Sequence, residues 1–335
     1  MSFYTDLKTL CAAHGVSGRE GAVRELLAQR ISPFADEVRT DALGNLIATK
    51  RGKGGKSVML CAHMDEIGFL VTVMEDSGML RVAPVGGISL VASAYTAVVS
   101  ERGCAGVFVP EGRTKAQDYQ NDKCFIDIGA RSAREAARVA RVGDFFVAEP
   151  SLRRLYGSRV AGRPLDDRVG CAILLGIAER LATKTLSGDV HYVFSVQEEV
   201  GCRGSKTAAF GLAPDYSLCF DVTGTGDVPG AAPMDCKLGG GAAIKLKDSS
   251  VICHEEVVSL LCELAEEQKI PHQREILTYG GTDTSSMQLA GAGSRAGALS
   301  VPTRYIHSGV ETCDLKDAEA CVALATCFVR RIAGE

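Results

Sequence analysis

Apolar positions along the chain recur with two spacings, one typical of helices and one typical of buried strands. In residues 19–31, Val23 and Leu27 share one helical face, and Ser17 is a candidate N-cap. In residues 191–196 the apolar run is nearly continuous, which indicates a buried strand. The same criteria predict helices over 3–12, 167–182, 255–268 and 315–332, a hairpin over 37–50, and strands over 57–62, 216–221, 271–277 and 298–301.

Strands that alternate with helices are typical of a mixed sheet whose two faces are both covered by helices. We therefore predict an α/β fold for most of the chain. In sheets of this kind, ligands bind at the carboxyl ends of the strands. Residues that follow the predicted strands are consequently the first candidates for chemistry.

The segment from residue 67 to about residue 147 has a different pattern, with short β runs separated by glycine. This pattern indicates a small β-rich module. Candidate functional residues lie on both sides of the module and hardly any lie within it. We therefore expect residues 67–160 to form a domain inserted into a larger one made of residues 1–66 and 161–335.

Composition narrows the class of protein. Of 335 residues, 46% are hydrophobic and 23% are charged, which is the balance of a globular protein. The net charge of −4 predicts no nucleic-acid partner and no anionic membrane partner. We find no apolar run of transmembrane length and no signal-peptide pattern at the start, and the 13 cysteines form no CxxC pair. We expect a cytoplasmic protein with buried thiols.

Two adjacent carboxylates, Glu198 and Glu199, follow the predicted strand over 191–196. Neighbouring negative charges at the end of a buried strand are unfavourable unless a positive charge lies beside them. A bound metal ion supplies such a charge. One carboxylate can then bind the ion while the other accepts a proton.

Other residues able to bind a metal also follow predicted strands. Strand 57–62 is followed by His63 and Asp65, and strand 216–220 by Asp221. His307 lies beyond the short strand near residue 300, and Asp166 with Asp167 precedes a helix. Imidazole and carboxylate together favour Zn²⁺, Co²⁺ or Mn²⁺ over a structural thiolate site.

Each of these residues also has an ordinary structural explanation. A single histidine is often a hydrogen-bonded core residue, and Asp166 or Asp167 could cap the helix that begins there. Asp221 could begin a turn, and Glu199 could be an exposed charge. Their common position at strand ends, with a doublet that needs neutralisation, favours the metal site.

The motifs resemble those of the tetrahedral metallo-aminopeptidases, the glutamyl aminopeptidase family. They are, in chain order, His63-Met-Asp65-Glu-Ile-Gly, Leu165-Asp166-Asp167-Arg, Gln197-Glu198-Glu199-Val-Gly, Phe220-Asp221 and Tyr305-Ile-His307-Ser. The resemblance covers nearly the whole chain, including the position of the inserted module. It implies a zinc-peptidase-like catalytic domain and a dinuclear metallo-aminopeptidase that acts on short peptides.

The resemblance also implies a role for each residue. One metal ion is expected on His63 and Asp221, and a second on Glu199 and His307. Asp166, or otherwise Asp167, is expected to bridge them, and we favour Asp166. Glu198 is the expected general base for a water activated by the two ions, Zn²⁺ or Co²⁺ or else Mn²⁺. Asp65 is expected to hydrogen-bond the far nitrogen of His63 and to fix its tautomer.

The family further implies a hollow tetrahedral dodecamer built from dimers, with the β-rich insertion as the dimerisation module. Two other functions stay open on the residues alone. One is a different metallohydrolase reaction at the same site, such as N-acyl amino acid deacylation or glycan hydrolysis. The other is a non-catalytic scaffold stabilised by metal.

Three further segments have two interpretations each. Gly280-Gly281-Thr282-Asp283 either lines the substrate pocket, with Met287 nearby, or forms an ordinary turn. Residues 237–243 are glycine-rich but lack the GK[ST] ending of a phosphate loop, so we expect a loop that approaches the site, although the proline of the family is missing. Ser294-Arg295 suits an acidic substrate side chain or is a solvated loop. The sequence leaves the preferred N-terminal residue and the native metal open.

Overall fold

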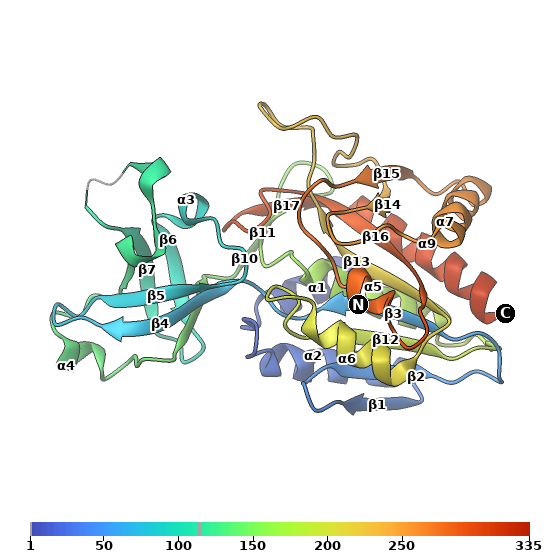
Figure 1. Ribbon diagram of the computed structural model, residues 1–335, viewed down its shortest axis with the longest axis horizontal. Helices are drawn as coiled ribbons and strands as arrows, with labels where there is room; N and C mark the ends of the chain where they lie inside the picture. Colours follow the sequence, from blue (N-terminus) through green and yellow to red (C-terminus); the bar gives the residue numbers. More distant parts are fainter. Residues whose placement is uncertain (1, 113–114) are drawn as a thin grey trace.

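The computed structural model describes residues 2–112 and 115–335. Figure 1 shows two parts side by side, a large α/β body and a smaller β structure formed by the cyan and green segment. The helices of the body are α1 (Phe3–Cys11), α2 (Gly21–Ile31), α5 (Arg168–Leu181), α6 (Arg203–Leu212), α7 (Glu255–Glu267), α8 (Thr284–Met287) and α9 (Leu315–Ala333), with the 3₁₀ turn η1 (Ser32–Phe34).

An eleven-stranded mixed sheet forms the centre of the body. Its main path runs β1-β2-β12-β3-β13-β16-β17-β11-β10, and β14 pairs with β15 and β16 beside this path. The strands are β1 (Glu37–Thr40), β2 (Leu46–Lys50), β3 (Val58–His63), β10 (Ser151–Arg154), β11 (Arg159–Arg163), β12 (Val190–Ser195), β13 (Tyr216–Thr223), β14 (Ala242–Lys247), β15 (His272–Ile276), β16 (Arg295–Arg304) and β17 (Glu311–Asp314).

Four central strands run parallel and bring their carboxyl ends to one edge. Strand β12 pairs with β3 so that Ser195 lies opposite His63, and β13 pairs with both β3 and β16. On β13, Asp221 lies opposite Ser300. The residues that follow these strands therefore meet at the same edge of the sheet.

Helices cover both faces of the sheet. On β3, Val58 and Leu60 belong to the core that α5 and α9 cover, whereas Met59 and Cys61 pack in a second core with residues of α6 and α8. This alternation is the two-residue period of a strand buried on both faces. The predicted fold class, a mixed α/β sheet with an inserted β-rich domain, is confirmed.

The inserted segment forms a closed barrel in the order β4-β5-β8-β7-β6-β9 with its own small core, in which the rings of Phe69 and Phe108 stack at 4.3 Å. Its elements are β4 (Gly68–Met74), β5 (Leu80–Val85), α3 (Leu90–Ser93), β6 (Thr96–Ser100), β7 (Ala105–Pro110), η2 (Ala116–Asp118), η3 (Asn121–Lys123), β8 (Cys124–Asp127), α4 (Ala133–Ala136) and β9 (Phe145–Ala148).

Strands β10 and β11 pair with the large sheet, although the expected boundary at residue 160 places β10 in the insertion and falls within β11. β11 lies antiparallel to β17, and β10 lies antiparallel to β11. Their short, mixed polar and apolar pattern resembles that of the barrel strands, so the sequence did not reveal which sheet they join. The role of the barrel in dimerisation stays a prediction.

Other local expectations were wrong. Ser17 does not cap α2, whose N-cap is Glu20. The hydroxyl of Ser17 instead donates to Asp65 Oδ2 at 2.6 Å. Part of the glycine-rich segment 237–243 begins strand β14, and α6 was not predicted.

The thirteen cysteines carry free thiols, most of them buried. Within the described residues, no helix is long and apolar enough to cross a membrane.

Candidate metal centre

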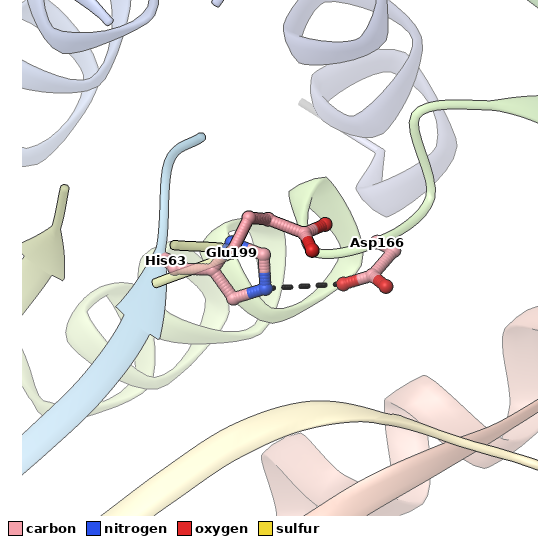
Figure 2. Close-up of side chains that lie close together, drawn as sticks. All are labelled: His63, Asp166 and Glu199. Carbon is pink, nitrogen blue, oxygen red and sulfur yellow. Dashed lines mark hydrogen bonds and ion pairs between the residues drawn. The ribbon is translucent and has the colours of Figure 1, made fainter. Parts of the chain in front are cut away.

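The predicted site residues converge at the carboxyl edge of the sheet. His63 ends β3, Asp221 lies near the end of β13, and Glu199 follows β12. Asp166 comes from the loop before α5, and His307 from the loop after β16. Figure 2 shows the side chains of His63, Asp166 and Glu199 gathered in one place.

Asp166 lies between the two histidines. Its Oδ1 is 3.0 Å from His63 Nε2, and its Oδ2 is 3.2 Å from His307 Nε2. The first of these contacts is the dashed line in Figure 2. Because each carboxylate oxygen faces a different imidazole, Asp166 can serve two sites at once.

A further carboxylate lies beside each histidine. Glu199 Oε2 is 3.2 Å from His307 Nε2, and Asp221 Oδ1 is 3.9 Å from His63 Nε2. The other oxygen of Glu199, Oε1, is buried and has no hydrogen-bond partner among the described residues. The arrangement thus has two halves, one around each imidazole.

Asp65 connects the segment that follows β3 to the segment that follows β12. Its carboxylate accepts hydrogen bonds from the backbone N–H groups of Glu198 and Glu199 at 2.9 and 3.2 Å. His63 Nδ1 lies 3.1 Å from the backbone oxygen of Asp65 and 3.4 Å from its Oδ1. The backbone oxygen is therefore the closer partner of the far nitrogen, where the carboxylate was expected.

Asp167 differs from Asp166 in its contacts. Its Oδ1 accepts from the backbone N–H of Gly170 at 2.9 Å and caps α5. Its Oδ2 is buried, with no hydrogen-bond partner in the described part of the chain. Asp167 also lies close enough to His63 and Asp221 for the three to hold one ion.

Two further carboxylates position the site: sequence reasoning missed Glu311, and it named Asp283 only as the end of the turn that begins at Gly280. Glu311, on β17, accepts from the backbone N–H of Asp166 at 3.1 Å and, through its other oxygen, from that of His307 at 3.1 Å. Asp283 accepts from the hydroxyls of Ser195 and Ser205 and lies close to Glu198. Glu311 follows no predicted strand, and nothing in the turn that ends at Asp283 indicates that its carboxylate contacts Ser195 and Ser205.

Two loops at the site contain non-glycine residues in the left-handed region. Gln197 and Cys202 flank the glutamate doublet at φ 56° and 49°. Tyr305 and His307 have φ 60° and 61°. Such conformations are strained for residues with a Cβ and are often found at functional sites.

The charges of the site are unbalanced without a cation. Burial, together with the nearby charge of Asp221, raises the pKa of Glu198 well above its usual range. Burial, together with the nearby charge of Asp166, also raises the pKa of Asp221 well above its usual range. For His63, burial opposes charge, yet the hydrogen bonds that its imidazole donates to the carboxylates of Asp166 and Asp65 hold its pKa well above the usual value. Crowded carboxylates beside imidazoles are a donor set that fits divalent cations.

A cavity of about 680 Å³ opens over these residues. Gly280, Gly281 and Thr282 line it, as one interpretation of that turn predicts.

Three other segments named from the sequence do not line the cavity. Met287 is fully buried in the core. Residues 237–243 do not line the cavity, because the N–H groups of Gly239 and Gly241 bind Asp317 and the chain then enters β14. Arg295 pairs with Glu256 at the start of β16, away from the cavity lining.

Comparisons with known proteins show which family the chain resembles in sequence and in fold. The family model described as M42 glutamyl aminopeptidase matches residues 44–324. A candidate aminopeptidase of Acetivibrio thermocellus is 45% identical over 321 residues, which are 95% of this chain and 96% of that protein.

Two solved structures extend the likeness to the whole fold. Aminopeptidase APDkam598 from the archaeon Desulfurococcus kamchatkensis is 36% identical with a TM-score of 0.94, over 99% of this chain and 95% of that one. The TET1 peptidase of Pyrococcus horikoshii, which can assemble into a tetrahedron or a large octahedral shell, is 36% identical with a TM-score of 0.87, over 98% and 99%. The predicted aminopeptidase class is confirmed, and the chain belongs to the M42 glutamyl aminopeptidase family.

Proposed function

We propose that this enzyme removes N-terminal residues from short peptides with two divalent metal ions in each subunit. His63 and Asp221 would hold one ion, Glu199 and His307 the other, and Asp166 would contact both. The observation that supports the pairing is the position of Asp166, whose two oxygens lie 3.0 and 3.2 Å from different imidazoles. Asp167 is already engaged as the cap of α5, which favours Asp166 as the bridge.

Bound ions would lower the pKa of a water molecule and polarise the scissile carbonyl. Glu198 lines the cavity beside the proposed ligands, and its backbone N–H is held by Asp65 at 2.9 Å. We assign Glu198 as the general base that accepts the proton of the water and delivers it to the leaving amine. Asp65 is then a positioning residue, because it holds the glutamate doublet and lies next to His63.

The metal-binding side of the cavity suits a peptide with a free N-terminus. The two proposed ions would offer a place for a free α-amine, whose nitrogen can act as a ligand. Blocking that amine removes this ligand, so acylated amino acids should be poor substrates. This distinguishes an aminopeptidase from a deacylase at the same site.

We further propose that the enzyme works as a homo-oligomer. The assembly of the P. horikoshii TET1 peptidase supports this proposal. The barrel projects from the body in Figure 1, which suits the proposed role as a dimerisation module. Sedimentation of the purified protein would measure its mass, and a monomer at micromolar concentration would contradict the proposal.

The assignment of Glu198 is tested by Glu198→Gln in the metal-loaded protein. We expect kcat to fall by about 10²-fold or more, because the amide cannot accept the proton, while metal content is unchanged. Glu266→Gln on the exposed face of α7 is the matched control and should retain full activity. Full activity in Glu198→Gln, or no hydrolysis of any free-amine substrate by the wild type, would overturn the proposal.

A further inference from the structure

The cavity wall beyond the proposed metal ligands differs in composition from the side that carries the carboxylates of Asp166, Glu199 and Asp221. It is formed by the end of β13, the loop that follows it, and the turn after β15. Apolar and hydroxyl side chains dominate this wall: Thr223, Thr225, Val228, Leu277, Tyr279 and Thr282. A substrate side chain placed here therefore leaves water for a mainly apolar surface.

Arg304 is the only lysine or arginine among the described residues that line the cavity. Its charge is already neutralised by Asp227. Arg304 Nε lies 2.9 Å from Asp227 Oδ1, and Arg304 Nη2 lies 2.7 Å from Oδ2. Asp227 also accepts from the backbone N–H of Leu238 at 3.1 Å. A bidentate pair held in this way offers little attraction to an incoming carboxylate.

A second cation, Lys245, lies behind the wall and is fully buried. Its Nζ contacts Glu275 and is 3.9 Å from Asp248 Oδ2. The same two carboxylates accept hydrogen bonds from the cavity wall, Glu275 from Thr223 Oγ1 at 2.8 Å and Asp248 from Thr282 Oγ1 at 3.3 Å. The ammonium is therefore unavailable to a ligand, and both hydroxyl protons are already used.

We propose that this pocket selects an uncharged, apolar N-terminal residue, such as leucine or methionine, and rejects glutamate and lysine. The inference rests on the proposed aminopeptidase function. A charged side chain in the pocket would lose its hydration, and no unpaired opposite charge on the described wall would replace it. An apolar side chain has no such hydration to lose, and its removal from water is favourable.

The first test is a rate profile of the metal-loaded wild type on leucyl, methionyl, glutamyl and lysyl p-nitroanilides. We expect kcat/KM for leucine or methionine to exceed that for glutamate and lysine by about 10²-fold. Rates for glutamate or lysine equal to or above those for leucine would overturn the inference.

A binding measurement separates this inference from the proposed function. Calorimetry with Leu-Gly, Glu-Gly and Lys-Gly on metal-loaded Glu198→Gln reports the pocket without turnover. We expect Leu-Gly to bind at least about tenfold more tightly than either charged dipeptide. If the wild type hydrolyses no substrate, the proposed function fails, yet this measurement still decides the preference, and equal binding overturns it.

The neutralising role of Asp227 is tested by Asp227→Asn, which leaves Arg304 without its carboxylate. We expect the ratio of kcat/KM for glutamate over leucine to rise at least about tenfold. Asp144→Asn is the matched control, because Asp144 faces Arg102 and Arg141 on the barrel; it should leave the ratio unchanged. An unchanged ratio in a folded Asp227→Asn variant would overturn the role of the pair. If that variant does not fold, the wild-type profile and the calorimetry still decide.

Discussion

Glu311 holds Asp166 and His307 with one carboxylate: its Oε2 accepts from the backbone N–H of Asp166 and its Oε1 from that of His307, both at 3.1 Å. Oε2 also accepts from the N–H of Leu165 at 2.7 Å. Two proposed metal ligands from distant parts of the chain thus share one buried anchor. Groups that orient ligands in this way usually affect metal affinity as strongly as some ligands do.

Glu311→Gln should therefore weaken metal binding. An amide has a single acceptor oxygen, so the backbone contacts made by one of the two carboxylate oxygens must be lost. We expect metal affinity to fall by about 10–100-fold, measured by titration of the metal-free protein. Activity should return at high metal concentration. Glu266→Gln serves as the control, and unchanged affinity in Glu311→Gln would show that the anchor is dispensable.

Much of this site could be predicted from the sequence because five of its residues follow strands that run in register. His63, Glu198, Glu199, Asp221 and His307 each come after a run of buried residues, and parallel pairing brings these runs to one edge. The periodicity that reveals such strands depends only on local sequence. Their meeting point then follows from the topology of α/β sheets.

The role of Glu311, the contacts of Asp283 and the Lys245 network could not be predicted in this way. They act through partners far away in the sequence: Glu311 lies 145 residues from Asp166, and Asp283 lies 88 from Ser195. A short polar strand such as β10 also carries no signal that distinguishes the barrel from the large sheet. Such features depend on packing between elements, which local patterns do not encode.

Removal of the metal ions should destabilise the protein more as the pH rises. Without a cation, burial raises the pKa of Glu198 and Asp221, so their ionisation above the unfolded-state pKa costs stability. Burial opposes charge on His307, but Asp166 and Glu199 raise its pKa to about 11. Its contribution is present below the unfolded-state pKa and is lost as the pH rises toward 11. The two carboxyl groups and the His307 imidazole therefore all make the metal-free protein less stable as the pH rises.

Thermal unfolding of chelator-treated protein between pH 6 and pH 9 would check this. We expect the midpoint to fall steadily with pH in the metal-free protein and to depend much less on pH after metal is restored, because bound cations favour the ionised carboxylates. Parallel pH profiles with and without metal would contradict the account of the site as a cation centre.

The Asp227–Arg304 pair should have the opposite pH dependence. The Arg304 guanidinium lowers the pKa of Asp227 to about 2. Because this value lies below that of the unfolded chain, about 3.8, the pair stabilises the protein above pH 4, and the effect is lost as the pH falls toward 2. The difference in unfolding free energy between wild type and Asp227→Asn should be constant from pH 7 to pH 5 and smaller at pH 3. A difference that grows on acidification would be inconsistent with the pair.

Lys245 is expected to matter more for stability than for chemistry. It is fully buried against Glu275, whose Oε2 has no hydrogen-bond partner among the described residues. Lys245→Met would leave a buried carboxylate unpaired, which costs about 3–5 kcal/mol. Urea unfolding at 25 °C measures this loss.

The double variant Lys245→Met/Glu275→Gln separates charge from packing. It removes both charges and leaves a neutral amide that can still accept from Thr223, so we expect it to recover part of the lost stability. Lys206→Met on the exposed face of α6 is the control and should change the unfolding free energy by less than about 0.5 kcal/mol. If the double variant is no more stable than Lys245→Met, the loss comes from packing around β14, and the ammonium is not what balances Glu275.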